Sequence, residues 1–324
     1  MPVECPFTLS IDDCKRVAAQ PKVDPSTDEQ LRQRVTASLS GTVLMMRLVY
    51  ILLAHQLPGQ LIRLVDRLEG PDVQLLIHLD LNMPDDEVRT VHRELAARPH
   101  VEFLRRHRCT WGAFSIVEST LEGLRRCESL TFDYAVLLSG QDYPIKSRDE
   151  IDSYLEQLAG KSIIDNNPFP MAEWNTGGWN RIQDYQAHDR RRWLRGVARV
   201  LNALPLRRPY PRGIHPYGGA QFWALSSPAV HYVLDFIARN PKFVAAYRFT
   251  FAADEMFFQT IVGNAGESVP RVGDAVNFLE WDRPGLTLTS DDFPTLAQTY
   301  HLYARKFDMR VDAAVLDMID KELL

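Results

Sequence analysis

The sequence predicts an α/β fold built on a mostly parallel sheet with helices on both faces. Short apolar runs, of strand length rather than helix length, alternate along the chain with segments whose apolar residues recur at helical spacing. Continuously apolar strands are typical of a sheet that is buried on both sides. Right-handed crossovers then place the carboxyl ends of the strands at one edge, where α/β proteins bind ligands.

Each expected element follows from local spacing. The helix at 57–68, for example, repeats apolar residues at Leu57, Leu61, Leu64, Val65 and Leu68. Strands are expected at 47–54, 73–79, 101–104, 134–138, 162–164, 221–225 and 275–281. Helices are expected at 57–68, 85–97, 114–127, 149–158 and 228–238, and from 313 onward. Residues 249–262 form a further mixed segment.

The stretch 134–146 is the centre of the predicted sheet. Its apolar strand breaks at Ser139 and Gly140, and we expect Pro144 to end any further ladder pairing. Gln141, Asp142 and Lys146 follow the break, so they are placed at the ligand-binding edge. The alternative is a tight turn that only starts the next helix at Ser147.

Composition excludes several classes of protein. With 324 residues, 45% hydrophobic residues and a net charge of −5, the chain is globular and unlike a generic nucleic-acid binder. Its four cysteines form no CxxC pair, so neither a zinc site nor a disulfide scaffold is expected. No apolar run reaches the ~18 residues that cross a bilayer, and no signal peptide is visible. We therefore expect a cytoplasmic or peripheral membrane location.

Two regions differ from the rest of the chain. Residues 1–45 are polar and are expected to be an extension, with a short helix at 28–39, before a catalytic domain at 46–324. Residues 166–216 are expected to be mostly loop with one helix, and they carry eight arginines between 190 and 212. This basic region is either a solvated face or a surface that contacts an anionic or membrane-bound partner.

Few residues are left to carry chemistry. The chain has no Walker loop, and His55 with its neighbours replaces the glycines of a dinucleotide site. Gln141 and Asp142 would clamp a divalent metal poorly. Glu255 lies before apolar residues that would raise its pKa as a general base requires, although Asp254 and Glu255 could instead cap a helix. Arg283 and Lys306 are cations that could converge on a diphosphate.

Residues 46–324 resemble the core-2/I-branching N-acetylglucosaminyltransferase and xylosyltransferase family, whose fold is of the GT-A glycosyltransferase type. The likeness rests on five stretches in order: 77–80, 138–146, 218–222, 253–255 and 304–308 with 311–312 behind them. The intervals of 28 positions from Glu255 to Arg283 and 23 from Arg283 to Lys306 are also similar to the family's.

The resemblance implies an inverting glycosyltransferase that needs no divalent metal or other cofactor. The expected donor is UDP-N-acetylglucosamine, with UDP-xylose or another UDP-sugar as the alternative, and the acceptor is a glycan or glycoconjugate hydroxyl. Glu255 would remove the acceptor proton, while Arg283 and Lys306 would stabilise the departing diphosphate. The activity implied is similar to β-1,6-N-acetylglucosaminyl transfer.

The resemblance also implies binding residues. Asp80 resembles the position that holds the nucleoside, with His55 beside it, and Trp111 and Asp142 are expected to line the same pocket. Arg181 and Trp179 are expected acceptor contacts. Trp174 and Trp179 either stack on a sugar or close a hydrophobic lid. Unlike animal members, the chain shows neither an N-terminal anchor nor several disulfide-forming cysteines.

Three rival functions stay open at this point. The first is a non-catalytic sugar-nucleotide or glycan-binding protein of the same fold. The second is a glycoside hydrolase, for which Asp142 and Glu255 are the candidate carboxylate pair. The third is a membrane-surface module that uses the arginines of the basic region. A nucleic-acid partner is not expected.

Overall fold

The computed structural model describes residues 45–186, 192–204, 207–279 and 287–324. The expected helix at 28–39, nearly all of the expected N-terminal extension, and Arg190, Arg191 and Arg283 therefore lie outside the described residues.

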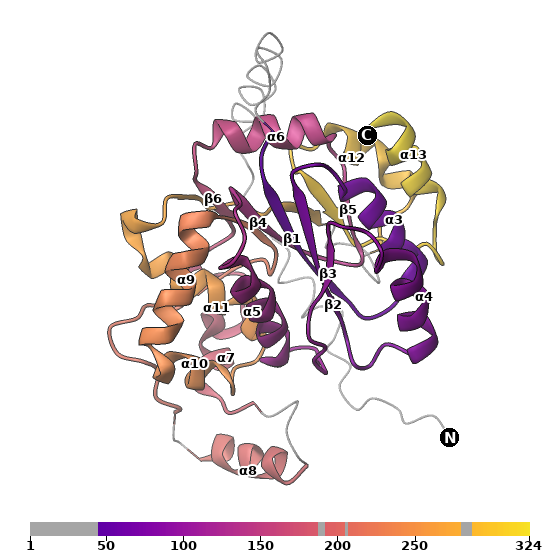
Figure 1. Ribbon diagram of the computed structural model, residues 1–324. Helices are drawn as coiled ribbons and strands as arrows, with labels where there is room; N and C mark the ends of the chain where they lie inside the picture. The colour runs from indigo at the N-terminus through magenta and orange to yellow at the C-terminus, as the bar shows by residue number, and fades with distance from the viewer. Residues whose placement is uncertain (1–44, 187–191, 205–206, 280–286) are drawn as a thin grey trace.

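A seven-stranded sheet forms the centre of the molecule, in the order β10-β6-β9-β4-β1-β2-β3 (Figure 1). Every neighbouring pair is parallel except those made by β9, which runs antiparallel to β4 and β6. The mostly parallel sheet predicted from the sequence is thus confirmed. The strands are β1 (Leu48–Ala54), β2 (Val73–Leu79), β3 (Val101–Phe103), β4 (Tyr134–Ser139), β6 (Ser162–Ile164), β9 (Trp223–Ser226) and β10 (Arg271–Val272).

Helices cover both faces of this sheet, as expected. α3 packs with α4 and α5 with α9, and Figure 1 shows these two pairs on opposite sides of the strands. α6 begins after a capping box in which Ser147 and Glu150 bond to each other's backbone N–H. The helices are α3 (Pro58–Leu68), α4 (Asp85–Leu95), α5 (Ser115–Cys127), α6 (Arg148–Gln157), α9 (Ser227–Arg239), α10 (Pro241–Tyr247), α11 (Phe257–Asn264), α12 (Phe293–Gln298) and α13 (Ala314–Glu322).

A second, three-stranded sheet corrects one expectation. β5 (Asp142–Pro144) pairs antiparallel with β12 (Tyr303–Arg305), which is parallel to β11 (Asn277–Leu279). The prediction that Pro144 ends ladder pairing was wrong, because β5 is an edge strand and an edge position tolerates a residue without an N–H donor.

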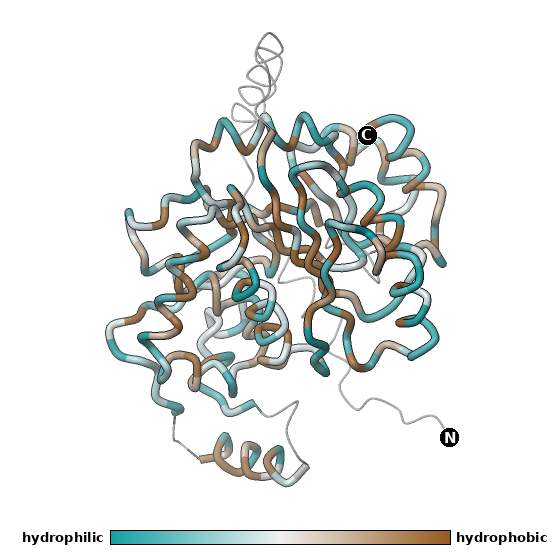
Figure 2. The backbone as a smooth tube through the Cα atoms, in the orientation of Figure 1, coloured by the Kyte–Doolittle hydropathy of each residue, from teal (hydrophilic) through white to brown (hydrophobic). Residues whose placement is uncertain are grey.

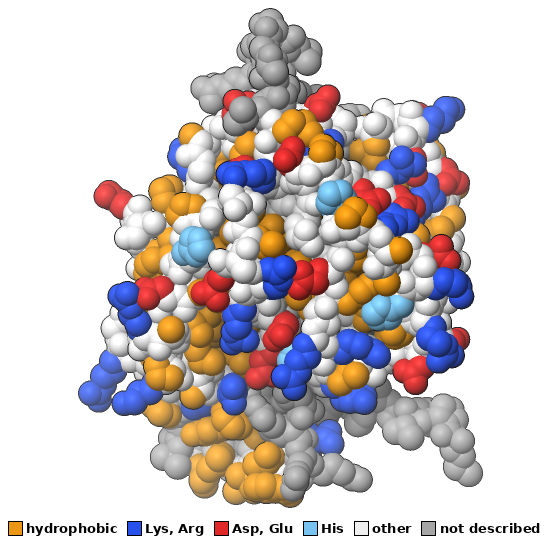
Figure 3. All heavy atoms as spheres, viewed as in Figure 1, with side chains coloured by type: hydrophobic (Ala, Val, Ile, Leu, Met, Phe, Trp, Pro, Cys, Tyr) orange, Lys and Arg blue, Asp and Glu red, His pale blue; other side chains and the backbone are white. Residues whose placement is uncertain are grey.

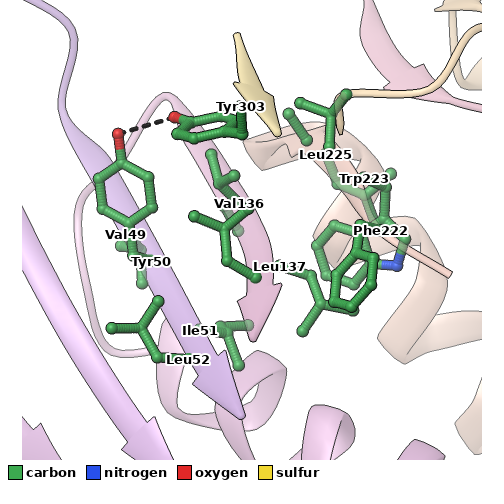
Figure 4. Packing of buried hydrophobic residues seen from close by; sticks show 14 of the residues in the cluster. Val49, Tyr50, Ile51, Leu52, Val136, Leu137, Phe222, Trp223, Leu225 and Tyr303 are labelled. Atoms are coloured by element: carbon green, nitrogen blue, oxygen red, sulfur yellow. Dashed lines mark hydrogen bonds between the residues drawn. The ribbon is translucent and has the colours of Figure 1, made fainter. Parts of the chain in front are cut away.

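The core joins the two sheets. Tyr50 of β1 and Tyr303 of β12 are both fully buried, and their hydroxyl oxygens lie 2.9 Å apart (Figure 4). Apolar side chains of β1, β4 and β9 pack around this pair, and Figure 2 shows the same hydrophobic character along the central strands. The core shared by the two sheets is closely packed, and it supports the carboxyl edge of the central sheet.

The region 166–216 contains more regular structure than expected. It holds the short strand β7 (Asn167–Pro168), which pairs with β8 (Tyr217–Gly218), the 3₁₀ turn η1 (Asn175–Gly178), α7 (Trp179–Gln183) and α8 (Arg192–Ala203). Three further 3₁₀ turns are η2 (Ala253–Glu255), η3 (Gly266–Ser268) and η5 (Ser290–Asp292). In the part of the chain that the structure describes, no helix is both long and apolar enough to cross a membrane.

Candidate active site

Backbone hydrogen bonds gather the carboxyl ends of several strands at one place. The amide of Asp80 donates to the carbonyl of Ala54 at 2.8 Å, which joins the ends of β1 and β2. The side-chain amide of Gln60 donates to the carbonyls of Gly140 and Phe307, both at 3.1 Å. The turn after β4 and the segment after β12, which begins with Lys306, are thereby held against the start of α3.

Asp80 shapes the loop that follows β2. One carboxylate oxygen accepts from the amide of Asn82 at 2.6 Å and the other from the amide of Cys109 at 3.1 Å. The side chain is 4% exposed, so it acts in this structure by fixing two loops beside each other.

The charges of several residues expected to bind the donor act on His55. Its pKa is lowered by burial first and then by the charges of Lys306 and Arg305, while Asp80 raises it. Three predicted donor residues, His55, Asp80 and Lys306, are therefore electrostatic neighbours, and Arg305 joins them. A neutral imidazole beside two cations suits an anionic ligand.

Asp142 lies behind this cluster rather than in it. Its side chain is fully buried, accepts from the backbone and hydroxyl of Ser139 and, at 2.6 Å, from the amide of Asn277, and lies 3.6 Å from Arg305. The expectation that the Asp142 side chain lines the pocket is corrected, because these internal contacts occupy its carboxylate. For the same reason Asp142 and Glu255 cannot flank a glycosidic bond.

Glu255 ends the turn η2 with a partly exposed side chain. Ala252, which precedes the turn, has a left-handed φ of 50°, and its amide donates to the carbonyl of Gly112 at 2.9 Å. Within the described residues no side chain caps α11, which begins at Phe257, so the helix-cap alternative is not supported. The carboxylate is 34% exposed, so part of it is open to a substrate hydroxyl although one oxygen is paired with Arg181.

Arg181 of α7 fixes the orientation of Glu255. Its guanidinium donates to the Glu255 carboxylate at 2.5 Å and stacks over the ring of Trp174 at 3.6 Å. Trp174 is 7% exposed and its ring lies under the Arg181 guanidinium, so its choice between sugar stacking and a hydrophobic lid stays a prediction. Trp179 is half-buried against Phe169, with ring centroids 5.7 Å apart.

Trp111 is an exposed aromatic ring on the loop that contacts the segment before η2. It is 73% exposed and meets Phe251 edge to face at 5.4 Å. Gly112 has a φ of +71°, and a Cβ there would lie 2.6 Å from the Phe251 ring, so only glycine fits. The loop after β3 is thus held against the loop that carries Glu255.

Steric crowding explains why positions 218 and 219 are glycines. A Cβ on Gly219 would lie 2.0 Å from the carbonyl oxygen of Asp165, and one on Gly218 would lie 2.6 Å from the Trp174 ring. The amide of Gly219 donates to the carbonyl of Glu255 at 3.0 Å. This close approach allows the residue after β8 to support the turn that carries Glu255.

Sequence reasoning missed two charged residues of the site. Asp254 is 9% exposed, its Oδ1 atom has no hydrogen-bond partner among the described residues, and burial and the charge of Glu255 raise its pKa to about 7. Arg305 lies over the ring of Phe222 at 4.1 Å. In the sequence, only their positions next to Glu255 and Lys306 could have indicated that Asp254 and Arg305 belong to the site. Adjacency in sequence does not tell which of two neighbouring side chains points into the protein.

Three further observations concern the site and its surroundings. Arg283, expected beside Lys306, lies outside the described residues, so its place on the diphosphate stays a prediction. Among the described residues, no three His, Cys, Asp or Glu side chains come together as metal ligands. A cavity of about 460 Å³ lies at the amino ends of β1 and β4, opposite to the edge that carries the site.

A partly exposed carboxylate and a cationic cluster at the carboxyl edge of such a sheet are typical of enzymes that bind phosphorylated ligands. The chain belongs to the core-2/I-branching enzyme family, whose model matches residues 48–295. The family resemblance and the GT-A-type α/β fold inferred from the sequence are thus confirmed.

Curated relatives carry out several kinds of transfer according to their names. The β-glucuronosyltransferase GlcAT14B of Arabidopsis thaliana is 27% identical over 301 residues, which are 86% of this chain and 66% of that protein. An N-acetyllactosaminide β-1,6-N-acetylglucosaminyltransferase of Mus musculus is 23% identical over 327 residues, 92% of this chain and 78% of that protein.

Xylosyltransferase 1 of Homo sapiens is 23% identical over 304 residues, 85% of this chain but only 30% of that protein. The chain therefore spans just under two thirds of the plant relative and less than a third of the human one. Among solved structures, the galactosyltransferase LgtC with donor and acceptor sugar analogues is similar with a TM-score of 0.36 and 8% identity, covering 80% of this chain and 86% of that one.

Proposed function

We propose that the chain is an inverting glycosyltransferase that moves a sugar from a UDP-sugar to a hydroxyl of a glycan or glycoconjugate. The observation that carries the proposal is the Glu255 carboxylate, which is partly exposed and held by Arg181. Family membership supports glycosyl transfer as the reaction class.

The proposed reaction requires one catalytic base. The acceptor oxygen attacks the anomeric carbon on the face opposite to UDP, and Glu255 takes the hydroxyl proton as the new C–O bond forms. The bond from the anomeric carbon to the diphosphate oxygen breaks, and its electron pair leaves with UDP. One displacement inverts the configuration at the anomeric carbon.

The leaving diphosphate needs positive charge. Lys306, with Arg305 and His55 near it, lies at the carboxyl edge of the sheet, and we propose that Arg283 joins it. Fixed cations would perform the task that a divalent metal performs elsewhere, so we propose that no metal is required. Asp80, which fixes the loops beside this cluster, is the proposed support of the nucleoside site.

The transferred sugar is the open choice within this proposal. We propose N-acetylglucosamine first, because a β-1,6-N-acetylglucosaminyltransferase shows similarity over 92% of this chain. Xylose and glucuronic acid are the competing sugars, since relatives are named for both. The acceptor contacts proposed are Arg181 and Trp179.

Donor binding is tested first by thermal shift in EDTA with UDP-N-acetylglucosamine, UDP-xylose, UDP-glucuronic acid, UDP-galactose and GDP-mannose. A ligand that binds the folded state raises its melting temperature, and the largest shift identifies the donor. Lys306→Ala should abolish the shift, while Lys242→Ala, an exposed lysine at the start of α10, should retain it. Binding that appears only with Mn²⁺ would contradict the metal-free mechanism.

Transfer is tested with Glu255→Gln. We expect this variant to bind the donor normally and to lose about 10²–10⁴-fold in turnover, because the amide cannot accept the proton. Glu267→Gln, an exposed glutamate in η3, serves as the control. Wild-type turnover by Glu255→Gln would instead favour a non-catalytic or differently catalysed role for the site.

A further inference from the structure

Helix α8 exposes an apolar face away from the rest of the molecule. Its large apolar side chains at 193, 197 and 200 recur at helical spacing, so they lie on one side of the helix, and Leu204 follows directly after its last residue. Their exposed fractions are 62% for Trp193, 45% for Val197, 63% for Val200 and 46% for Leu204. Three such residues on one short helix, with Leu204 just after it, expose apolar surface that a monomeric soluble protein rarely presents without a partner.

The opposite side of α8 is polar, and it contacts Tyr185 in the segment that follows α7. The side-chain amide of Asn202 accepts from the Tyr185 amide at 2.7 Å and donates to the Tyr185 carbonyl at 2.9 Å. Arg195 and Arg199 are exposed on this polar side. Figure 1 shows α8 at the lower end of the molecule, Figure 2 shows its hydrophobic character, and Figure 3 shows hydrophobic side chains gathered there.

The segment that contains α8 carries side-chain charge of one sign. Residues 192–212 contain six arginines and no aspartate or glutamate, although the whole chain has a net charge of −5. One of these arginines, Arg208, is buried, so neither the solvated face nor the partner surface that the sequence suggested includes all of them. Arg195, Arg199, Arg207 and Arg212 are exposed, and Arg207 also pairs with Asp184 at 3.1 Å.

Arg208 is the buried member of this group. It is 7% exposed and donates to the carbonyls of Ile182 and Ala246 at 2.8 and 2.6 Å. Burial lowers its pKa to about 10. This arginine therefore ties the chain after α8 to α7 and α10 and is not available to a partner.

We propose that α8 is an interfacial helix that lies on an anionic bilayer, with its apolar face in the headgroup–acyl boundary. An amphipathic helix with tryptophan and aliphatic residues on one face and arginines on the other is the pattern for this mode of binding. The helix spans Arg192–Ala203, far short of the ~20 residues that cross a bilayer, so it lies along the surface.

A second copy of the chain is a poorer occupant of the face. A two-fold contact through α8 would place the same arginine-rich segment of both copies together, since such an interface pairs identical patches. No acidic residue of 192–212 is present to offset that repulsion. Anionic lipid, in contrast, complements the exposed arginines and the apolar face at once.

The test is co-sedimentation of the full chain with phosphatidylcholine vesicles, with and without phosphatidylglycerol. We expect binding to the anionic vesicles that weakens as salt is raised. Trp193→Ser combined with Val200→Ser should lower partition about tenfold or more. Val311→Ser is the matched control, because Val311 is 62% exposed but lies outside α8, and it should bind like the wild type.

Two further measurements separate the contribution of the arginine charges to membrane binding from the insertion depth of the apolar face. Arg195→Glu with Arg199→Glu should weaken binding to anionic vesicles by roughly fivefold or more for each charge removed. Brominated lipid should quench tryptophan fluorescence in the wild type, and Trp193→Phe should remove most of that quenching. Partition of Trp193→Ser/Val200→Ser at the wild-type level would overturn the proposal.

The competing occupant has its own signature. If the wild type ignores anionic vesicles but self-associates with rising concentration, and Trp193→Ser/Val200→Ser abolishes that association, the face belongs to a second copy and the membrane proposal fails. None of these variants touches Glu255 or Lys306, so the outcome is independent of the proposed transferase function.

Discussion

The guanidinium of Arg181 lies 2.5 Å from the carboxylate of Glu255, and the two residues come from separate segments on the chain. The ring of Trp174 supports the arginine at 3.6 Å and limits its movement. The carboxylate proposed as the base is therefore held in one orientation before any substrate arrives.

The first prediction concerns this positioning. Arg181→Met should lower kcat/KM by about 10–100-fold, because a small displacement of the base from the acceptor hydroxyl slows proton transfer. Binding of the donor should be unchanged. Arg239→Met, which removes an exposed ion pair with Asp235, is the control. Unchanged kcat/KM in Arg181→Met would show that the ion pair has no catalytic importance.

The second prediction concerns Asp254 and pH. Burial raises its pKa in the folded protein to about 7, whereas its value in the unfolded chain is near the usual 3.8. Between these values the folded state keeps a proton that the unfolded state has lost. The free energy of unfolding should therefore fall as pH rises from about 4 to about 7, by on the order of 2–4 kcal/mol.

Asp254→Asn removes this titration. Urea unfolding at pH 5 and pH 7.5 should show the variant gaining stability relative to wild type at the higher pH, because its amide carries no charge to bury. Asp235→Asn, at an exposed position, should keep the wild-type pH profile. If the difference in free energy of unfolding between the wild type and Asp254→Asn is the same at both pH values, Asp254 does not titrate in this range.

The third prediction compares two glycines. Gly219→Ala should destabilise the fold by about 1–3 kcal/mol or more, because its Cβ would lie 2.0 Å from the carbonyl oxygen of Asp165. Gly59→Ala should instead be neutral or stabilising by up to about 1 kcal/mol, since Gly59 lies in α3 with nothing within 4 Å of the new Cβ. Thermal melts of both variants test the contrast, and equal effects would contradict the close approach.

The fourth prediction concerns the two buried tyrosines that join the sheets. Tyr50→Phe and Tyr303→Phe should each cost about 1–3 kcal/mol, because each leaves the other hydroxyl buried without its 2.9 Å partner. The double variant should cost less than the sum of the two single variants. Urea unfolding of all four proteins gives the coupling energy, and strict additivity would show that the hydroxyls do not interact.

Much of the fold was predictable from local spacing. The strand expected at 73–79 is Val73–Leu79, and the helix expected at 57–68 is Pro58–Leu68. Apolar periodicity is a property of neighbouring residues, so it survives without knowledge of the tertiary structure. The expected strand at 275–281 is described only as far as residue 279, where the observed strand is Asn277–Leu279.

The site was partly predictable for the same reason. His55 and Asp80 follow the neighbouring strands β1 and β2, so a common sheet edge brings them together. Lys306 follows β12 of the second sheet and is brought to that edge by tertiary contacts, such as the hydrogen bond from Gln60 to the carbonyl of Phe307. Asp142 follows a strand as well, yet its carboxylate is buried against Asn277 and Arg305. Whether a polar side chain at a strand end faces solvent or the interior depends on which distant element covers it.

The sequence by itself determined the alternation of strands and helices, the ligand-binding edge and Glu255 as the candidate base. The tertiary structure alone decided that β9 runs antiparallel, that Pro144 belongs to a second sheet, and that Arg181 meets Glu255. These features join segments far apart along the chain. Local periodicity reports which face of an element is buried, but the partner across that face is chosen by packing of the whole domain.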